Sequence, residues 1–243
     1  MNQMSKKFNY ENIEIGYYDN VFHRNYGSQS KWHHLKFKHL MNKLGDYSRH
    51  LDIGCGPGTF IGMLSNNRQS IGIDISQKQI DYAQKQYGCD NHKFILFEKD
   101  SLLPFPNEYF DVITIIELIE HLNPDQCRLM IQEAYRILSP NGHILITTPN
   151  YSSLWPVFEK VVNLLTPVSY KDQHIFKFKR KSLINLFEYC QLNNYSINKF
   201  QSFAFFFAYF NWNLPDLINE IEFKIFNHRL GLLLIAEIKK NFT

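Results

Sequence analysis

The sequence lacks any run of about 18 uncharged apolar residues, so no membrane-spanning helix is expected. Its first ten residues are polar and lack the apolar core of a secretory signal peptide. The 26 basic and 23 acidic residues nearly cancel, and the net charge of +3 is too small to indicate nucleic-acid binding by itself. These absences argue against an integral membrane protein and make nucleic acid an unlikely partner, while a peripheral membrane contact stays open.

The sequence also has few cysteines, and they are widely spaced. The four stand at positions 55, 89, 127 and 190 and form no C-x-x-C pair. Neither a zinc site nor a disulfide framework is therefore expected, and a reducing, cytoplasmic location is predicted. No internal repeat or low-complexity linker interrupts the 243 residues, which suffice for one α/β domain with a decorated edge.

One short stretch, D-I-G-C-G-P-G, organises the chain from Asp52 onward. It includes the end of the mostly apolar segment 50–53, which predicts a central parallel strand. The glycines at 54, 56 and 58 carry no Cβ, so the backbone can bend sharply and approach a ligand. A helix is predicted to begin at Phe60, and the N-terminus of a helix suits an anionic ligand group.

An acidic residue lies at the end of the second predicted strand, residues 70–75. Asp74 stands 20 residues beyond Gly54, where a carboxylate accepts hydrogen bonds from the ribose hydroxyls of a nucleoside. The alternative is that Asp74 only supports the helix that Ser76 begins. Thr59 stands where the dinucleotide fingerprint G-x-G-x-x-G needs its third glycine, which disfavours a nicotinamide-dependent oxidoreductase.

Apolar periodicity predicts the remaining elements. Strands are expected at residues 93–97, 110–116, 143–148, 195–200 and 230–238. Helices are expected at residues 31–44, 76–87, 123–138, 151–165 and 180–189. Residues 27–30 are predicted to form a loop with an N-cap at Ser28 or Ser30, and residues 139–142 to stop the preceding helix.

Three segments together resemble the class I S-adenosylmethionine-dependent methyltransferases. They are D-I-G-C-G-P-G, L-P-F-P-N-E-Y-F-D-V-I at residues 103–113 and E-x-x-E-H at residues 117–121, and the resemblance covers residues 49–148. The pattern is most similar to small-molecule and ubiquinone-pathway O-methyltransferases. It implies an α/β fold with a Rossmann-like, doubly wound sheet of seven strands, mostly parallel with an antiparallel last strand, and helices on both faces. It also implies an N-terminal helical cap at residues 1–48 and a cofactor-binding domain at 49–243, with a substrate-side insertion at about 151–230.

The resemblance implies that S-adenosylmethionine is the cofactor. In this reading the glycine turn holds the amino-acid end, Asp74 holds the ribose, and Asp100 with Ser101 holds the adenine. A turn-forming role is the alternative for Asp100. The implied cofactor-binding residues are Asp52, Gly54, Cys55, Gly56, Gly58, Asp74, Ile75, Asp100, Ser101 and Glu117.

The E-x-x-E-H segment lies where the family places residues that face the transferred methyl group. In one hypothesis His121 is a general base oriented by Glu117, because an imidazole titrates near neutral pH. In a second, Glu117, Glu120 and His121 bind a divalent metal ion, as similar segments do in ubiquinone-pathway and small-RNA methyltransferases, with His174 as a fourth ligand. In a third, these residues only cap and orient the loop.

Residues outside the shared segments are candidates for contact with the substrate. Tyr18, Trp32 and His174 are the three predicted here, with plain packing as the alternative for Tyr18 and Trp32 and a solvated loop position for His174. The aromatic segment 203–212 is too short to span a bilayer and is expected to serve as core packing, a lid, a dimer face or a membrane-contacting tip.

The predicted function is in-line transfer of a methyl group to an oxygen of a small or lipid- or glycan-like molecule. One alternative is metal-dependent 2′-O-methylation of RNA. A second alternative is a non-catalytic protein that binds S-adenosylmethionine and regulates a partner. The identity of the acceptor, the metal dependence and the oligomeric state do not follow from the sequence.

Overall fold

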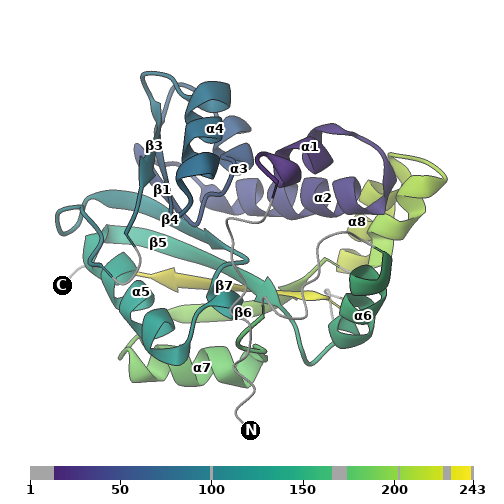
Figure 1. The fold of residues 1–243 in the computed structure, drawn as a ribbon. Helices are drawn as coiled ribbons and strands as arrows, with labels where there is room; N and C mark the ends of the chain where they lie inside the picture. The colour runs from purple at the N-terminus through teal and green to yellow at the C-terminus, as the bar shows by residue number, and fades with distance from the viewer. Residues whose placement is uncertain (1–13, 99–100, 166–173, 202, 227–230, 242–243) are drawn as a thin grey trace, which may run out of the picture.

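The computed structural model describes residues 14–98, 101–165, 174–201, 203–226 and 231–241. A seven-stranded sheet runs through it in the order β3-β2-β1-β4-β5-β7-β6 (Figure 1). Strands β1 to β5 pair in parallel, and β7 is antiparallel to both β5 and β6. This topology confirms the predicted Rossmann-like fold with an antiparallel last strand. The strands are β1 (Arg49–Ile53), β2 (Gln69–Asp74), β3 (His92–Leu96), β4 (Phe110–Ile116), β5 (Leu138–Pro149), β6 (Tyr195–Phe200) and β7 (Leu233–Lys239).

Helices cover both faces of the sheet, as predicted. In Figure 1, α1, α2, α3 and α4 lie above it, whereas α5 and α7 lie below. The helices are α1 (Tyr17–His23), α2 (Gly27–Leu44), α3 (Thr59–Gly62), α4 (Gln77–Tyr87), α5 (Pro124–Ile137), α6 (Trp155–Leu165), α7 (Arg180–Tyr189) and α8 (Leu214–Phe226), with the 3₁₀ turns η2 (Ile119–His121) and η3 (Phe203–Tyr209). No described helix is both long enough and apolar enough to cross a membrane.

Two apolar layers hold these helices to the sheet. Below it, Ile131 of α5 and Phe187 of α7 are fully buried against strand residues such as Ile113. Above it, Leu40 of α2 is fully buried in a cluster that includes Val112 of β4. Burying an aliphatic side chain of this size stabilises the fold by about 1.5–3 kcal/mol, so α2 is a structural part of the sheet's covering layer.

Helix α2 begins earlier than predicted. Residues 27–30 are its first turn and not a loop, and the extended residue before it is Tyr26. The expected N-caps at Ser28 and Ser30 are wrong, because no side chain caps this helix and the buried Ser30 hydroxyl donates to the Phe22 carbonyl of α1 at 2.9 Å. Tertiary contact with α1 therefore decides where α2 starts.

Helix α5 begins as the sequence predicts. Asn123 and Gln126 form a capping box, in which the Asn123 side chain accepts from the Gln126 N–H at 2.9 Å and Pro124 occupies the first helical position. The predicted stop at residues 139–142 lies inside β5, as an irregular start at which the register to β4 shifts. Asn141 has a φ of +63°, a left-handed conformation that asparagine tolerates.

The aromatic segment is partly core. In η3, Phe205 is buried with its ring centroid 5.0 Å from that of Trp32. Phe206, Phe207 and Phe210 are exposed, and Phe210 has 85% of its surface accessible. The core-packing expectation is therefore confirmed for Phe205 and for the buried Ala204 and Ala208, and the role of the exposed rings stays a prediction.

Candidate active site

A cavity of about 300 Å³ opens at the carboxyl ends of β1, β2 and β4. Helix α2 closes it from above and the end of β5 borders it at Pro149. Its lining brings together most of the predicted site residues: Tyr18, Trp32, Asp52, Gly54, Cys55, Gly56, Asp74, Ile75, Ser101, Glu117, Glu120, His121 and His174. Asp100 lies outside the described residues.

The glycine turn after β1 forms one wall. Gly54 has a φ of +77°, and a Cβ there would lie 2.9 Å from a methyl carbon of Leu118, so this position needs glycine. Gly56 also has a positive φ, of +51°, but a Cβ there would meet nothing within 4 Å. The space beside Gly56 is thus open to a ligand. Gly58 does not line the cavity, because its Cα faces the ring of Phe94.

The turn uses its N–H groups internally. Gly54 and Cys55 both donate to the Ile73 carbonyl, Gly58 donates to the Cys55 carbonyl, and Gly56 donates to Asp74. The helix that follows, α3, is only four residues long, so the expected helix N-terminus for an anion is poorly developed. A pyrophosphate needs free N–H donors, and those of Gly54, Cys55, Gly56 and Gly58 already donate within the protein.

Asp74 ties the glycine turn to α4. Its Oδ2 accepts from the Gly56 N–H at 2.9 Å, and its Oδ1 accepts from the Ser76 N–H at 2.9 Å. The helix-supporting alternative is therefore present in the structure. Each carboxylate oxygen has a further lone pair, so the same side chain can also accept from a ligand, and its ribose role stays a prediction.

Asp52 is a buried carboxyl group beside the cavity. Only 2% of its surface is exposed, and its Oδ1 accepts from the Thr114 hydroxyl at 2.6 Å. Burial raises the Asp52 pKa to about 7, against the lowering effect of the Thr114 hydrogen bond and with a further rise from the charge of Asp74. A cationic ligand group in the cavity would find here a carboxylate to pair with.

Glu117 follows β4 with a φ of +49°, and its N–H donates to the Thr147 carbonyl at 3.0 Å. Its carboxylate forms an ion pair with Lys36 of α2, whose side chain is almost fully buried. The sequence prediction missed Lys36. Its place between the buried Leu35 and Phe37, four residues after the buried Trp32, was the signal that could have found it.

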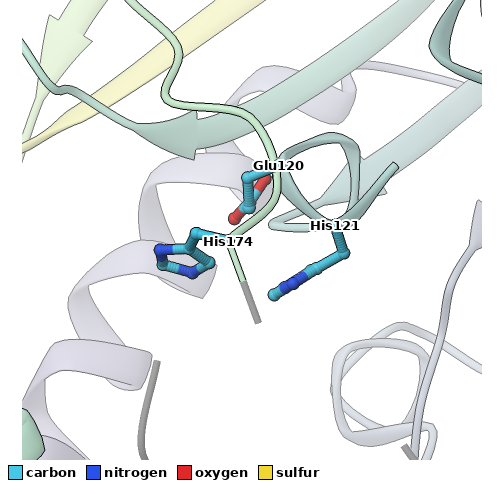
Figure 2. A group of neighbouring side chains, drawn as sticks. All are labelled: Glu120, His121 and His174. Carbon is cyan, nitrogen blue, oxygen red and sulfur yellow. The ribbon is translucent and has the colours of Figure 1, made fainter. Parts of the chain in front are cut away.

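Glu120, His121 and His174 form a compact group at the other end of the cavity. One potential ligand atom from each lies within 4.8 Å of the others, and Figure 2 shows the three side chains gathered around a shared space. Of the four predicted metal ligands, this group contains Glu120, His121 and His174 and does not contain Glu117, and metal binding stays a prediction.

Glu120 is fully buried, and its two oxygens differ. Oε2 accepts from the Thr148 hydroxyl at 3.0 Å, whereas Oε1 has no hydrogen-bond partner among the described residues. Burial raises the Glu120 pKa to about 7, although the nearby His174 opposes the rise. An unpartnered buried carboxylate oxygen is costly, so this position favours a ligand or ion that can complete it.

His174 is held from behind by two residues that the sequence prediction missed. Its Nδ1 lies 2.7 Å from the Tyr151 hydroxyl and 2.8 Å from Oε1 of Glu159. Burial would raise the Glu159 pKa, but the hydrogen bonds from His174 and Tyr151 outweigh it and lower that pKa. No local sequence pattern marks these contacts.

The two aromatic candidates for substrate contact, Trp32 and Tyr18, lie in different environments. Trp32 is buried and packs edge-on against Phe205 and beside Trp155, so its packing alternative is present while one side still reaches the cavity. Tyr18 lines the cavity, with its ring 5.9 Å from that of His33. A substrate contact stays a prediction for both residues.

A family model of the methyltransferase domain matches residues 28–197, which is more than half of the chain. The chain belongs to the class I S-adenosylmethionine-dependent methyltransferases. The demethylmenaquinone methyltransferase of Lactobacillus johnsonii is 31% identical over 156 residues, which cover 56% of this chain and 62% of that protein. The mitochondrial ubiquinone biosynthesis O-methyltransferase of Rattus norvegicus is 34% identical over 110 residues, which cover 43% of this chain and 31% of that protein.

Solved structures agree on the fold. A methyltransferase from Archaeoglobus fulgidus, described as dependent on S-adenosylmethionine, matches with a TM-score of 0.62 at 20% identity, covering 92% of this chain and 99% of that one. This methyltransferase therefore has the architecture of its family over almost its full described length. The chain spans less than two thirds of the curated relatives named above, so their whole activities do not transfer to it.

The raised pKa of Asp52 has a consequence for the stability of the ligand-free methyltransferase. The folded state keeps this proton to a higher pH than the unfolded chain, so the stabilising contribution is complete below about pH 4 and is lost as the pH rises through about 7. Between these limits we expect stability to fall by on the order of 4 kcal/mol more in the wild type than in Asp52→Asn, which cannot ionise. Urea unfolding at several pH values measures the difference.

Other buried groups titrate in the same range, so the comparison between variants carries this test. Asp90→Asn, at an exposed position, is the matched control and should follow the wild type. Parallel pH curves for the wild type and Asp52→Asn would show that Asp52 is not a buried acid of this kind.

Proposed function

We propose that this methyltransferase transfers a methyl group to an oxygen of a small, largely apolar molecule. The observation that carries the proposal is that one cavity joins the glycine turn and Asp74 to the group of Glu120, His121 and His174. A cofactor at the turn and an acceptor at the group would thus lie in the same enclosed space. The relative from Rattus norvegicus is named as an O-methyltransferase, which supports oxygen as the acceptor atom.

The residues of the turn fit S-adenosylmethionine better than a dinucleotide. Because its N–H groups are used internally, the turn offers carbonyl groups and bare Cα surface, and Asp52 offers a carboxyl group. These groups suit the ammonium of an amino-acid end, and Asp74 suits the ribose hydroxyls. When bound, the cofactor supplies a methyl group on a positively charged sulfur.

Part of the cavity wall near the Glu120–His121–His174 group is apolar. Leu122, Leu129 and Met130 line it beside His121. An apolar wall binds an apolar acceptor and keeps water out, which strengthens electrostatic interactions within the site. In this proposal the chain positions the acceptor, and His121 takes the proton of its hydroxyl.

A divalent metal ion is a second way to ionise the acceptor, and the grouping of Glu120, His121 and His174 supports it. Two imidazoles and one carboxylate form a ligand set that suits first-row ions such as Zn²⁺ or Mn²⁺. An ion there would also complete Oε1 of Glu120. We propose Glu120, His121 and His174 as its ligands.

The other sequence-based hypotheses remain open. Methylation of RNA is separated from a small-molecule reaction by a gel shift with short RNA at low and moderate salt. A non-catalytic binding protein would bind cofactor without turnover on any acceptor.

A cytoplasmic location is supported by the four cysteines, which form no disulfide. A peripheral membrane contact is supported by the exposed aromatic rings of η3.

The proposed cofactor can be tested by binding. We expect S-adenosylhomocysteine but not NAD to bind in isothermal titration calorimetry. Asp74→Ala should weaken that binding by roughly 1–3 kcal/mol, because a charge-assisted hydrogen bond to the ribose is lost. Asp81→Ala, at an exposed position of α4, is the control and should bind like the wild type. Equal affinities for Asp74→Ala and the wild type would remove the ribose assignment.

A second prediction concerns the base. With an acceptor found from a panel of prenylated phenols and lipid-linked hydroxyl compounds, His121→Ala should lower the transfer rate by roughly 10²- to 10⁴-fold. Affinity for S-adenosylhomocysteine should stay unchanged in this variant. If the rate survives instead, His121 only orients the loop.

A third prediction concerns the metal. Calorimetric titration with Mn²⁺ or Zn²⁺ should show one site, and Glu120→Gln and His174→Asn should each weaken it by roughly tenfold or more. Glu117→Gln is the sharpest control, because Glu117 lies outside the group and should leave the ion's affinity intact. Absence of binding in the wild type rejects the ion while leaving the general-base proposal standing.

A further inference from the structure

Three side chains behind the Glu120–His121–His174 group form a closed set of contacts. Tyr151 lies two residues after the end of β5, Glu159 belongs to α6, and His174 comes after α6 in the sequence. The Tyr151 hydroxyl lies 2.9 and 3.0 Å from the two oxygens of Glu159, and Nδ1 of His174 lies 2.8 Å from one of them. Both Tyr151 and His174 are at least nine-tenths buried, so water competes little for these contacts.

The contacts of Nδ1 indicate where the ring proton sits. This atom also lies 2.7 Å from the Tyr151 hydroxyl, whose own proton is donated to Glu159. The Tyr151 hydroxyl donates to both oxygens of Glu159, which identifies this side chain as a carboxylate whose oxygens accept. A bare Nδ1 at 2.8 Å would set its lone pair against an oxygen lone pair, which repels, whereas Nδ1–H donates a charge-assisted hydrogen bond. The Tyr151 O–H is also directed to Glu159, so one carboxylate receives two donors.

We propose that Glu159, braced by Tyr151, holds His174 as its Nδ1–H tautomer, so that Nε2 carries the lone pair of the ring. The ring of His174 lies 5.1 Å from the ring of His121, centroid to centroid, inside the group that borders the cavity (Figure 2). With Nδ1 engaged by Glu159, Nε2 is the ring nitrogen that can serve the reaction. Glu159 and Tyr151 are positioning residues, since they act on the substrate only through His174.

This inference rests on the proposed function for its role, but its geometry is independent of the reaction. A carboxylate on the far nitrogen fixes the orientation of an imidazole and makes the near nitrogen more basic, whether that nitrogen meets a proton or an ion. The device also links α6 to the site, because α6 carries Glu159.

The test reads the tautomer directly. Long-range ¹H–¹⁵N correlation spectra of the full chain, labelled with ¹⁵N-histidine and saturated with S-adenosylhomocysteine, show which nitrogen of each ring is protonated. His174→Asn assigns the signal. We expect His174 in the wild type to be protonated at Nδ1, and Glu159→Gln to shift it to a mixture of tautomers.

Two further variants sharpen the reading. Glu188→Gln, at an exposed position of α7, is the matched control and should leave the His174 signal unchanged. Tyr151→Phe keeps the carboxylate and should retain mainly the Nδ1–H form. On any acceptor that is found, Glu159→Gln should lower kcat by roughly 10- to 100-fold, with the KM for cofactor unchanged.

The outcomes separate the two proposals. A wild-type His174 protonated at Nε2, or a folded Glu159→Gln with an unchanged tautomer, overturns the inference even where the cofactor binds. If Glu159→Gln does not fold, the wild-type spectrum alone decides the tautomer. Failure of the wild type to bind S-adenosylhomocysteine overturns the proposed function instead, and the tautomer result stands by itself.

Discussion

The parallel pairing of β1 with β2 and β4 is the constraint on which the site depends. Parallel strands deliver their carboxyl ends to one edge of a sheet, where the connections leave. Asp52, Asp74 and Glu117 are separated by up to 65 residues in sequence, yet each lies within one residue of the end of its strand at this edge. The hydrogen bond from Gly56 to Asp74 then joins the first two connections into one rigid wall.

The electrostatics of the site follow from its burial. Asp52 and Glu120 lie at opposite ends of one cavity, and burial raises the pKa of each to about 7. The buried ammonium of Lys36, in the cavity lining, is paired with Glu117. Neither Asp52 nor Glu120 forms an ion pair within the described residues, so a positively charged ligand gains more here than in water.

Local sequence signals predicted what is local. The apolar runs gave the strands, the Asn123-Pro124 pair gave the start of α5, and the glycine spacing gave the turn and the open space beside Gly56. The ion pair of Lys36 with Glu117 and the contacts of His174 with Glu159 could not be predicted in this way. They join segments whose approach is set by tertiary packing. The apolar neighbours of Lys36 mark that side chain as buried, but they do not identify its partner. The early start of α2 at Gly27 has the same origin.

The two ends of the cavity are built from different parts of the chain. The cofactor end consists of connections within the parallel half of the sheet, whereas Glu159, His174 and Trp155 come from the excursion between β5 and α7. If the proposed function holds, exchange of that excursion would change the acceptor preference and leave the proposed cofactor end unaltered. One fold can in this way carry out a different reaction while its sheet and glycine turn stay the same.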